Sequence, residues 1–277
     1  MTVLAIAADL WRHAFARKWF LVLGGAVTLF LVVIALSLRL EVVDGALAGM
    51  RLFGKSTTVE ITAVDVALRP IFKATAIILY YPFTLFLIAL CAEFAPSLLQ
   101  AGRIEHMLSL PVRRWELVLG TYLGVVGLSA LFSLYGAGGL CVILGVKTGV
   151  FTLRPVLAAL LGTTTFATVY SGMLAAAVLA RSATSSAGVG MALYFAGVLA
   201  GYRTSVAPMM SEGLSRRVFE AVTAVLPRIS TLGNVASDVA GGRAVSVAHV
   251  GGLCAGFLAF AAAVLAVTMW GFERKDF

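Results

Sequence analysis

The chain has 277 residues, of which 61% are apolar and 12% are charged. Soluble domains average ~45–50% apolar and ~25% charged residues, and one of this size would expose large adhesive apolar patches. The mean hydropathy of +1.00 points the same way. The composition therefore indicates an integral membrane protein, and it excludes a disordered, collagen-like or disulfide-rich chain.

The net charge of +8 comes mainly from residues that lie between long apolar runs. In a membrane protein such charge is explained by anionic lipid headgroups, so we expect the lipid bilayer as a partner and no nucleic acid. Cys91, Cys141 and Cys254 each fall inside an apolar run and form no CxxC pair. We therefore expect no disulfide, no metal site and no cofactor in this chain. We also expect no cleavable signal peptide.

Six apolar runs are long enough to cross a hydrocarbon core of about 30 Å, which takes about 20 helical residues. They are 19–38, 74–95, 117–144, 156–180, 187–202 and 247–270. The runs are continuous rather than alternating, so they predict a single all-α transmembrane domain over residues 1–277 and not a β-barrel. Near the end of the third run, Gly136, Gly138 and Gly139 indicate a site where the helix could break.

No Asp, Glu, Lys or Arg lies in the middle of any run. A charge at mid-bilayer is costly and marks proton or ion paths, so its absence argues against a proton pump or an ion-coupled carrier. Small residues four apart are typical of close helix packing, and three pairs show this spacing. They are Gly120 with Gly124, Gly197 with Gly201, and Gly252 with Gly256.

The stretch from Leu4 to Lys18 predicts an amphipathic helix at the membrane interface. Its apolar face holds Leu4, Ala7, Ala8, Trp11 and Phe15, and its positive charge comes from Arg12, Arg17 and Lys18. An even number of spans places both termini on one side. The density of Lys and Arg per loop residue favours the cytosol for that side.

A second amphipathic stretch, Arg216 to Leu226, lies in the outer segment before the last run. Its apolar residues include Val218, Phe219 and Val222, and they recur at helical spacing. We expect an outer-face cap or a re-entrant helix here.

Residues Gly49 to Ser56 match the P-loop pattern GxxxxGK[ST]. Phosphate binding by this pattern needs a strand before the loop and a helix after it, so that amide groups converge on the phosphate. The residues that follow, Thr57 to Val66, alternate like a short strand. We interpret the match as coincidence and expect no nucleotide site in this chain.

The loop between the second and third runs predicts a short amphipathic helix. Ser97 can cap it, Leu98, Ala101 and Leu108 recur at helical spacing, and Pro111 ends it. Such a short helix needs a surface on which to dock. Physical reasoning alone leaves lipid headgroups and a protein partner as alternatives.

The segment from Gly102 to Gly120 resembles the signature of ABC-2-type transporter permeases, G-T-[IL]-E-x-L-L-S-x-P-V-x-R followed by G-K. The matching residues are Gly102, Ile104, Glu105, Leu108, Ser109, Pro111, Val112, Arg114 and Gly120. Arg103 and Thr121 depart from the usual threonine and lysine. The stretch from Val225 to Gly242 and the tail from Phe272 to Phe277 are similar to further family segments.

The resemblance implies the membrane subunit of an ATP-driven transporter, with six spans and a short cytosolic coupling helix between spans 2 and 3. Its expected partners are two cytosolic ABC ATPase subunits, which hold ATP and Mg²⁺, and a second permease subunit, identical or closely related. The expected ATPase-coupling residues are Gly102, Ile104, Glu105, Leu108, Ser109, Pro111, Val112 and Arg114. The expected location is the bacterial or archaeal inner (cytoplasmic) membrane, multi-pass, with both termini cytosolic.

Two polar stripes are candidates for a substrate path: Tyr80 with Thr84, and Thr164 with Thr168 and Ser171. Such hydroxyls can equally bond to backbone carbonyls and join helices. The apolar walls favour export of a lipid-like or amphipathic cargo.

We expect no catalysis by the chain alone, because its loose serine and histidine candidates, Ser171 and His249, have no recognisable oxyanion donors. Two alternatives to export remain. One is a permease linked to copper-enzyme maturation, although Met209 and Met210 alone make a poor copper site. The other is a membrane scaffold without transport.

Overall fold

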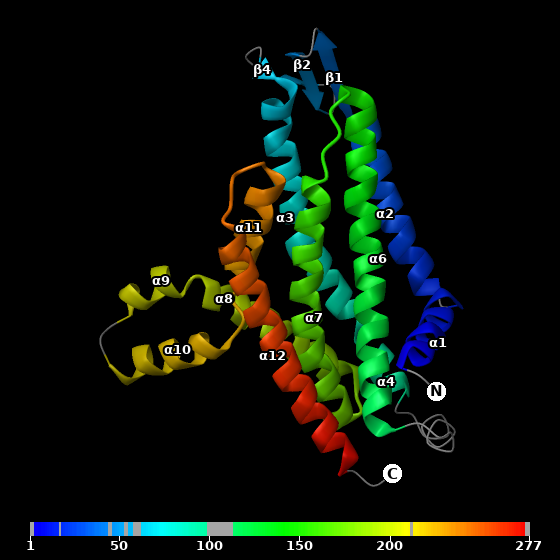
Figure 1. Cartoon of the computed structure of the whole chain (residues 1–277), viewed down its shortest axis with the longest axis vertical. Helices are drawn as coiled ribbons and strands as arrows, with labels where there is room; N and C mark the ends of the chain where they lie inside the picture. The colour runs from blue at the N-terminus through cyan, green and yellow to red at the C-terminus, as the bar shows by residue number, and fades with distance from the viewer. Residues whose placement is uncertain are drawn as a thin grey trace.

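The structure, a computed structural model, describes residues 3–16, 18–43, 46–52, 55–57, 62–98, 113–210 and 213–274. The helices are α1 (Val3–Ala16), α2 (Lys18–Ser37), α3 (Val64–Cys91), α4 (Phe94–Leu98), α6 (Arg114–Thr148), α7 (Arg154–Ala180), α8 (Ala183–Gly201), α9 (Arg203–Val206), the 3₁₀ turn η1 (Ala207–Met209), α10 (Leu214–Val225), α11 (Ile229–Ala240) and α12 (Val247–Glu273). Most of them run along a tall bundle, with both termini near one end (Figure 1).

Five helical segments are long and apolar enough to cross a membrane: Leu68–Ser97, Arg114–Thr148, Arg154–Ala180, Ala183–Gly201 and Val247–Glu273. The bent pair Val3–Ala16 and Leu21–Ser37 makes a sixth crossing if it counts as one broken span. The structure thus agrees with a predominantly helical, multi-pass membrane protein. The exact six-span layout stays a prediction.

The expected break in the third run is wrong, because α6 continues without interruption from Arg114 to Thr148. Two of the three glycines near its end, Gly136 and Gly139, contact α2 instead. A Cβ at Gly139 would lie 2.5 Å from Leu31 Cδ1, and one at Gly136 would lie 3.4 Å from Val27 Cγ1. Missing side chains at these positions let the two helices approach closely.

A small antiparallel sheet occupies the end of the bundle opposite the termini (Figure 1), and the all-α prediction did not include it. Strand β2 (Ala46–Leu52) pairs with β1 (Leu38–Val43), β3 (Lys55–Thr57) and β4 (Thr62–Ala63). In the P-loop-like stretch, Leu52 on β2 is paired with Lys55 on β3. A strand therefore stands where a phosphate-binding loop needs a helix.

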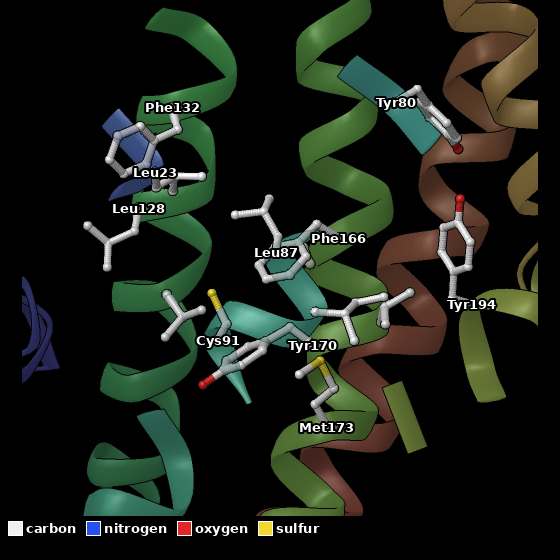
Figure 2. Close-up of a cluster of buried hydrophobic side chains, with 14 of the residues drawn as sticks. Leu23, Tyr80, Leu87, Cys91, Leu128, Phe132, Phe166, Tyr170, Met173 and Tyr194 are labelled. Atoms are coloured by element: carbon white, nitrogen blue, oxygen red, sulfur yellow. The ribbon is translucent and has the colours of Figure 1, made fainter. Parts of the chain in front are cut away.

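The core is centred on α7, which packs against α3, α6, α8, α11 and α12. Of its most apolar stretch 78% is buried, against 17% for α12. Phe166 and Tyr170 stack with ring centroids 5.8 Å apart, and Tyr122 stacks on Tyr170 at 6.3 Å. Figure 2 shows Phe166 and Tyr170 of this cluster, with Tyr170 beside Cys91. Among the described buried side chains, the Tyr170 hydroxyl lacks a hydrogen-bond partner.

Helix α1 uses a second face that the sequence analysis did not predict. Leu4 and Phe15 of the expected apolar face are 74% and 51% exposed, as suits a lipid-facing surface. Beside that face, Ile6, Leu10 and Ala14 form a buried strip at i, i+4 spacing. Ala7 and Trp11 of the expected apolar face also contact α6.

The buried face of α1 packs against α6 at Gly120 and Gly124, where α6 has no side chains. A Cβ at Gly120 would lie 2.7 Å from Ile6 Cβ, and one at Gly124 would lie 3.3 Å from Ala7 Cα. The indole nitrogen of Trp11 donates a hydrogen bond to the Gly124 carbonyl at 2.8 Å. The predicted glycine pair thus holds α1 against the first half of α6.

We expect Gly120→Ala to destabilise the α1–α6 contact, because the new Cβ would overlap Ile6. Overpacking of this kind costs about 1–3 kcal/mol. The matched control is Gly138→Ala on the same helix, where nothing lies within 4 Å. Thermal unfolding of the detergent-solubilised chain should show a lower midpoint for Gly120→Ala alone. Equal midpoints for the two variants would contradict this packing.

Candidate functional site

Most of the predicted coupling residues lie outside the described part of the chain. Residues 99–112 contain Gly102, Ile104, Glu105, Leu108, Ser109, Pro111 and Val112. Their described neighbours, α4 and the start of α6, lie at the same end of the bundle as both termini (Figure 1). The segment therefore connects to the rest of the protein at that end.

The short amphipathic helix predicted between Ser97 and Pro111 lies almost entirely outside the described residues, so it stays a prediction. Helix α4 spans Phe94–Leu98, and Ser97 lies in its last turn. The Ser97 hydroxyl donates to the Phe94 carbonyl at 2.9 Å. Within the described residues this bond stabilises the end of α4.

Arg114, the one described residue of the predicted coupling set, joins the start of α6 to the end of α12. Its Nη1 lies 3.4 Å from the Phe272 carbonyl oxygen and 3.2 Å from that of Glu273. A guanidinium at a helix C-terminus satisfies carbonyls that have no partner inside the helix, and it complements the helix dipole. Arg114 therefore ties the residues after the signature loop to the C-terminal helix.

The start of α6 has its own stabilising contact. The Glu116 carboxylate accepts a hydrogen bond from the Arg113 backbone N–H at 3.0 Å. An acidic side chain in the first turn also favours the positive end of the helix dipole. Thr121, where the family has lysine, donates its hydroxyl proton to Leu117 of its own helix at 2.7 Å.

The candidate substrate-path residue Tyr80 lies at a junction of three helices, which we call the Tyr80 junction: Tyr80 on α3, Thr165 on α7 and Ile229 on α11. Tyr80 is 2% exposed, and its hydroxyl donates to the Ile229 carbonyl at 2.9 Å. The same oxygen lies 2.6 Å from the Thr165 hydroxyl. The Thr165 hydroxyl also lies 3.3 Å from the Leu161 carbonyl oxygen of its own helix, so either hydroxyl can be the donor between Tyr80 and Thr165.

Helix α11 begins inside the bundle, beside this junction. The Ser230 hydroxyl donates to the Val198 carbonyl of α8 at 2.9 Å. A Cβ at Gly197 would lie 2.6 Å from Ile229 Cδ1, and one at Gly233 would lie 2.5 Å from the Tyr81 hydroxyl. The start of α11 is thus packed between α8 and α3. The glycine spacing at 197 and 201 signalled a close contact, but it did not identify α11 as the neighbour.

The other predicted path residues bond to backbone carbonyls. Thr84 donates to Tyr80 at 2.5 Å and Thr164 to Leu160 at 3.0 Å. Ser171 donates to Thr168 at 2.7 Å. These bonds agree with the second use that the sequence analysis left open for them, and their role in a path stays a prediction.

Thr168 joins two helices. Its hydroxyl lies 3.0 Å from the Thr164 carbonyl on α7 and 3.2 Å from the Phe257 carbonyl on α12.

A small cavity lies between α3 and α7, beside Tyr80 and Gly162. Its volume is about 10 Å³, comparable with the space that one water needs. This cavity is too small for a lipid-like cargo.

Charged side chains gather nearer the sheet end. Asp238 on α11 lies 3.1 Å from the Lys73 ammonium and 3.6 Å from the Arg243 guanidinium. Across the described residues, no three His, Cys, Asp or Glu side chains come close enough to hold a metal ion.

A scan against protein-family models finds no matching family, and a search of curated proteins finds no match. A functional interpretation therefore depends on the signature-like residues 102–120 and on the geometry around them.

We expect Tyr80→Phe to lower the free energy of unfolding by about 1 kcal/mol, because hydrogen bonds between membrane helices contribute of this order. Tyr135→Phe is the matched control, since the Tyr135 hydroxyl bonds to Thr28 at 3.0 Å on an exposed surface. Unfolding of the full chain in mixed micelles measures both. If the control were destabilised as much as Tyr80→Phe, the Tyr80 junction would not be a special anchor for α11.

Proposed function

We propose that this chain is the membrane-spanning permease subunit of an ATP-driven transporter of the ABC-2 type. The observation that carries the proposal is the position of the signature-like segment. Residues 99–112 lead directly into α6, an unbroken helix of 35 residues that is about 50 Å long. A push on that segment would therefore reach the far end of the bundle along one rigid element.

Three further contacts would spread such a push beyond α6. Arg114 links its start to the end of α12. Gly120 and Gly124 contact α1 about two and three turns later, and Gly139 contacts α2 near the far end of α6. Tightly packed elements move as bodies and not by continuous deformation. A displacement at residues 99–112 would thus shift four helices together.

The energy source in this proposal is a partner. Two cytosolic ATPase subunits would hold ATP and Mg²⁺ and dock on residues 99–112 of two permease subunits. A partner can shift a conformational equilibrium only by binding two states with different affinity, and an ATPase dimer that closes around ATP offers such a difference. The absence of charge from the middle of the apolar runs supports an energy source outside the bilayer.

The cargo we propose is lipid-like or amphipathic, and its direction is export. The buried hydroxyls of Tyr80, Thr168 and Ser171 are engaged by carbonyls. Because these three hydroxyls are already bonded inside the protein, they suit an apolar cargo better than a hydrated ion, which would need free polar groups. In this arrangement both termini lie in the cytosol, at the same end as the coupling segment.

We expect Glu105→Arg to abolish co-purification with the proposed partner ATPase, or to abolish the hydrolysis coupled to it. The matched control is Glu41→Arg on β1, the same charge reversal at the opposite end of the bundle. Tandem affinity purification followed by an ATPase assay measures both properties. Unchanged association and unchanged hydrolysis by Glu105→Arg would refute the docking role. Association without transport in vesicles would favour the scaffold alternative.

A further inference from the structure

Helix α10 lies apart from the bundle. Figure 1 shows α9 and α10 projecting sideways, roughly across the direction in which α6, α7 and α12 run. The main neighbours of α10 are α8 and the turn η1. A helix that crosses the direction of the membrane spans runs roughly parallel to the plane of the membrane.

The two faces of α10 differ in what covers them. On the inner face Thr223 is 3% exposed and Phe219 is half-buried. The outer face carries four large apolar side chains at helical spacing: Leu214, Val218, Val222 and Val225, which are 79%, 53%, 54% and 72% exposed. A continuous apolar stripe of this kind is disfavoured in water and marks a contact surface.

Positive charge flanks the apolar stripe. Arg217 is exposed, and Arg216 pairs with Glu220 at 3.0 Å. Beside them an open hollow of about 570 Å³ is lined by Gly213, Leu214, Arg216, Arg217 and Glu220. The segment 203–228 contains four arginines and two glutamates, so its net charge is positive. Apolar residues on one side and arginine on the flank are the features of helices that lie on anionic membranes.

We propose that α10 is an interfacial helix that binds an anionic phospholipid surface. Its apolar stripe inserts among the acyl chains, and Arg217 with the adjoining hollow receives the phosphate. A second copy of this chain is a poorer occupant, because the chain carries a net charge of +8 and offers little negative charge to the arginines beside the stripe. The proposal depends on membrane insertion and not on the transport function.

The test uses the full chain in nanodiscs of phosphatidylcholine with an increasing fraction of phosphatidylglycerol. Amide hydrogen exchange of the peptide covering residues 213–226 reports the contact. We expect the anionic lipid to slow this exchange. Arg217→Gln should raise the phosphatidylglycerol fraction at half-maximal protection about fivefold, the effect of one basic residue at an anionic surface. The matched control Arg243→Gln, 73% exposed but outside α10, should leave it unchanged.

A second variant tests the apolar stripe independently of charge. Val218→Ser with Val222→Ser should speed exchange of the same peptide in every lipid mixture. Exchange that is the same with and without phosphatidylglycerol would overturn the proposal. Protection that appears only in discs holding two chains, whatever the lipid, would also overturn it and identify a protein interface.

Discussion

The fold depends on the need of every buried polar group for a partner inside the protein, because hydrocarbon offers none. The hydroxyls of Tyr80, Thr168 and Ser230 meet this need across helix boundaries, each on a carbonyl of another helix. Two of these bonds fix α11, which has 12 residues and is too short to cross a bilayer alone. The position of α11 inside the bundle therefore follows from its hydrogen bonds as much as from its apolar surface.

Besides these hydrogen bonds, the packing of the helices depends on glycines, which let two helix backbones approach closely. Gly120 and Gly124 receive α1, and Gly197 and Gly233 receive the start of α11 and the tyrosines of α3. Gly252 and Gly256 on α12 have the same spacing but open space beside them in the single chain. Spacing alone thus identifies helices that can pack closely, while the structure shows which ones do.

The sequence predicted the long helices well, because a run of about 20 apolar residues has few alternatives to a membrane helix. Alternation at Thr57 to Val66 indicated a short strand, but the sequence did not predict the sheet that β1 to β4 form, and it did not predict the burial of Ile6, Leu10 and Ala14 on α1. It also missed the role of Arg114, since the partner carbonyls lie more than 150 residues away in the chain. Contacts between distant segments leave no local pattern from which to predict them. Seven of the eight predicted coupling residues fall outside the described chain and remain predictions.

The central claim is that mechanical work enters this protein through residues 99–112. Those residues lead into the start of α6, where Arg114 reaches α12 and Gly120 reaches α1, so the segment has a direct route into the bundle. Site-specific photo-crosslinking in cells tests the claim most directly, with the photoreactive amino acid at Glu105 and, for comparison, at Met50 on the sheet. The account predicts a crosslink to the ATPase from position 105 and none from position 50. A crosslink from position 50 alone, or from neither position in an assembled complex, would contradict it.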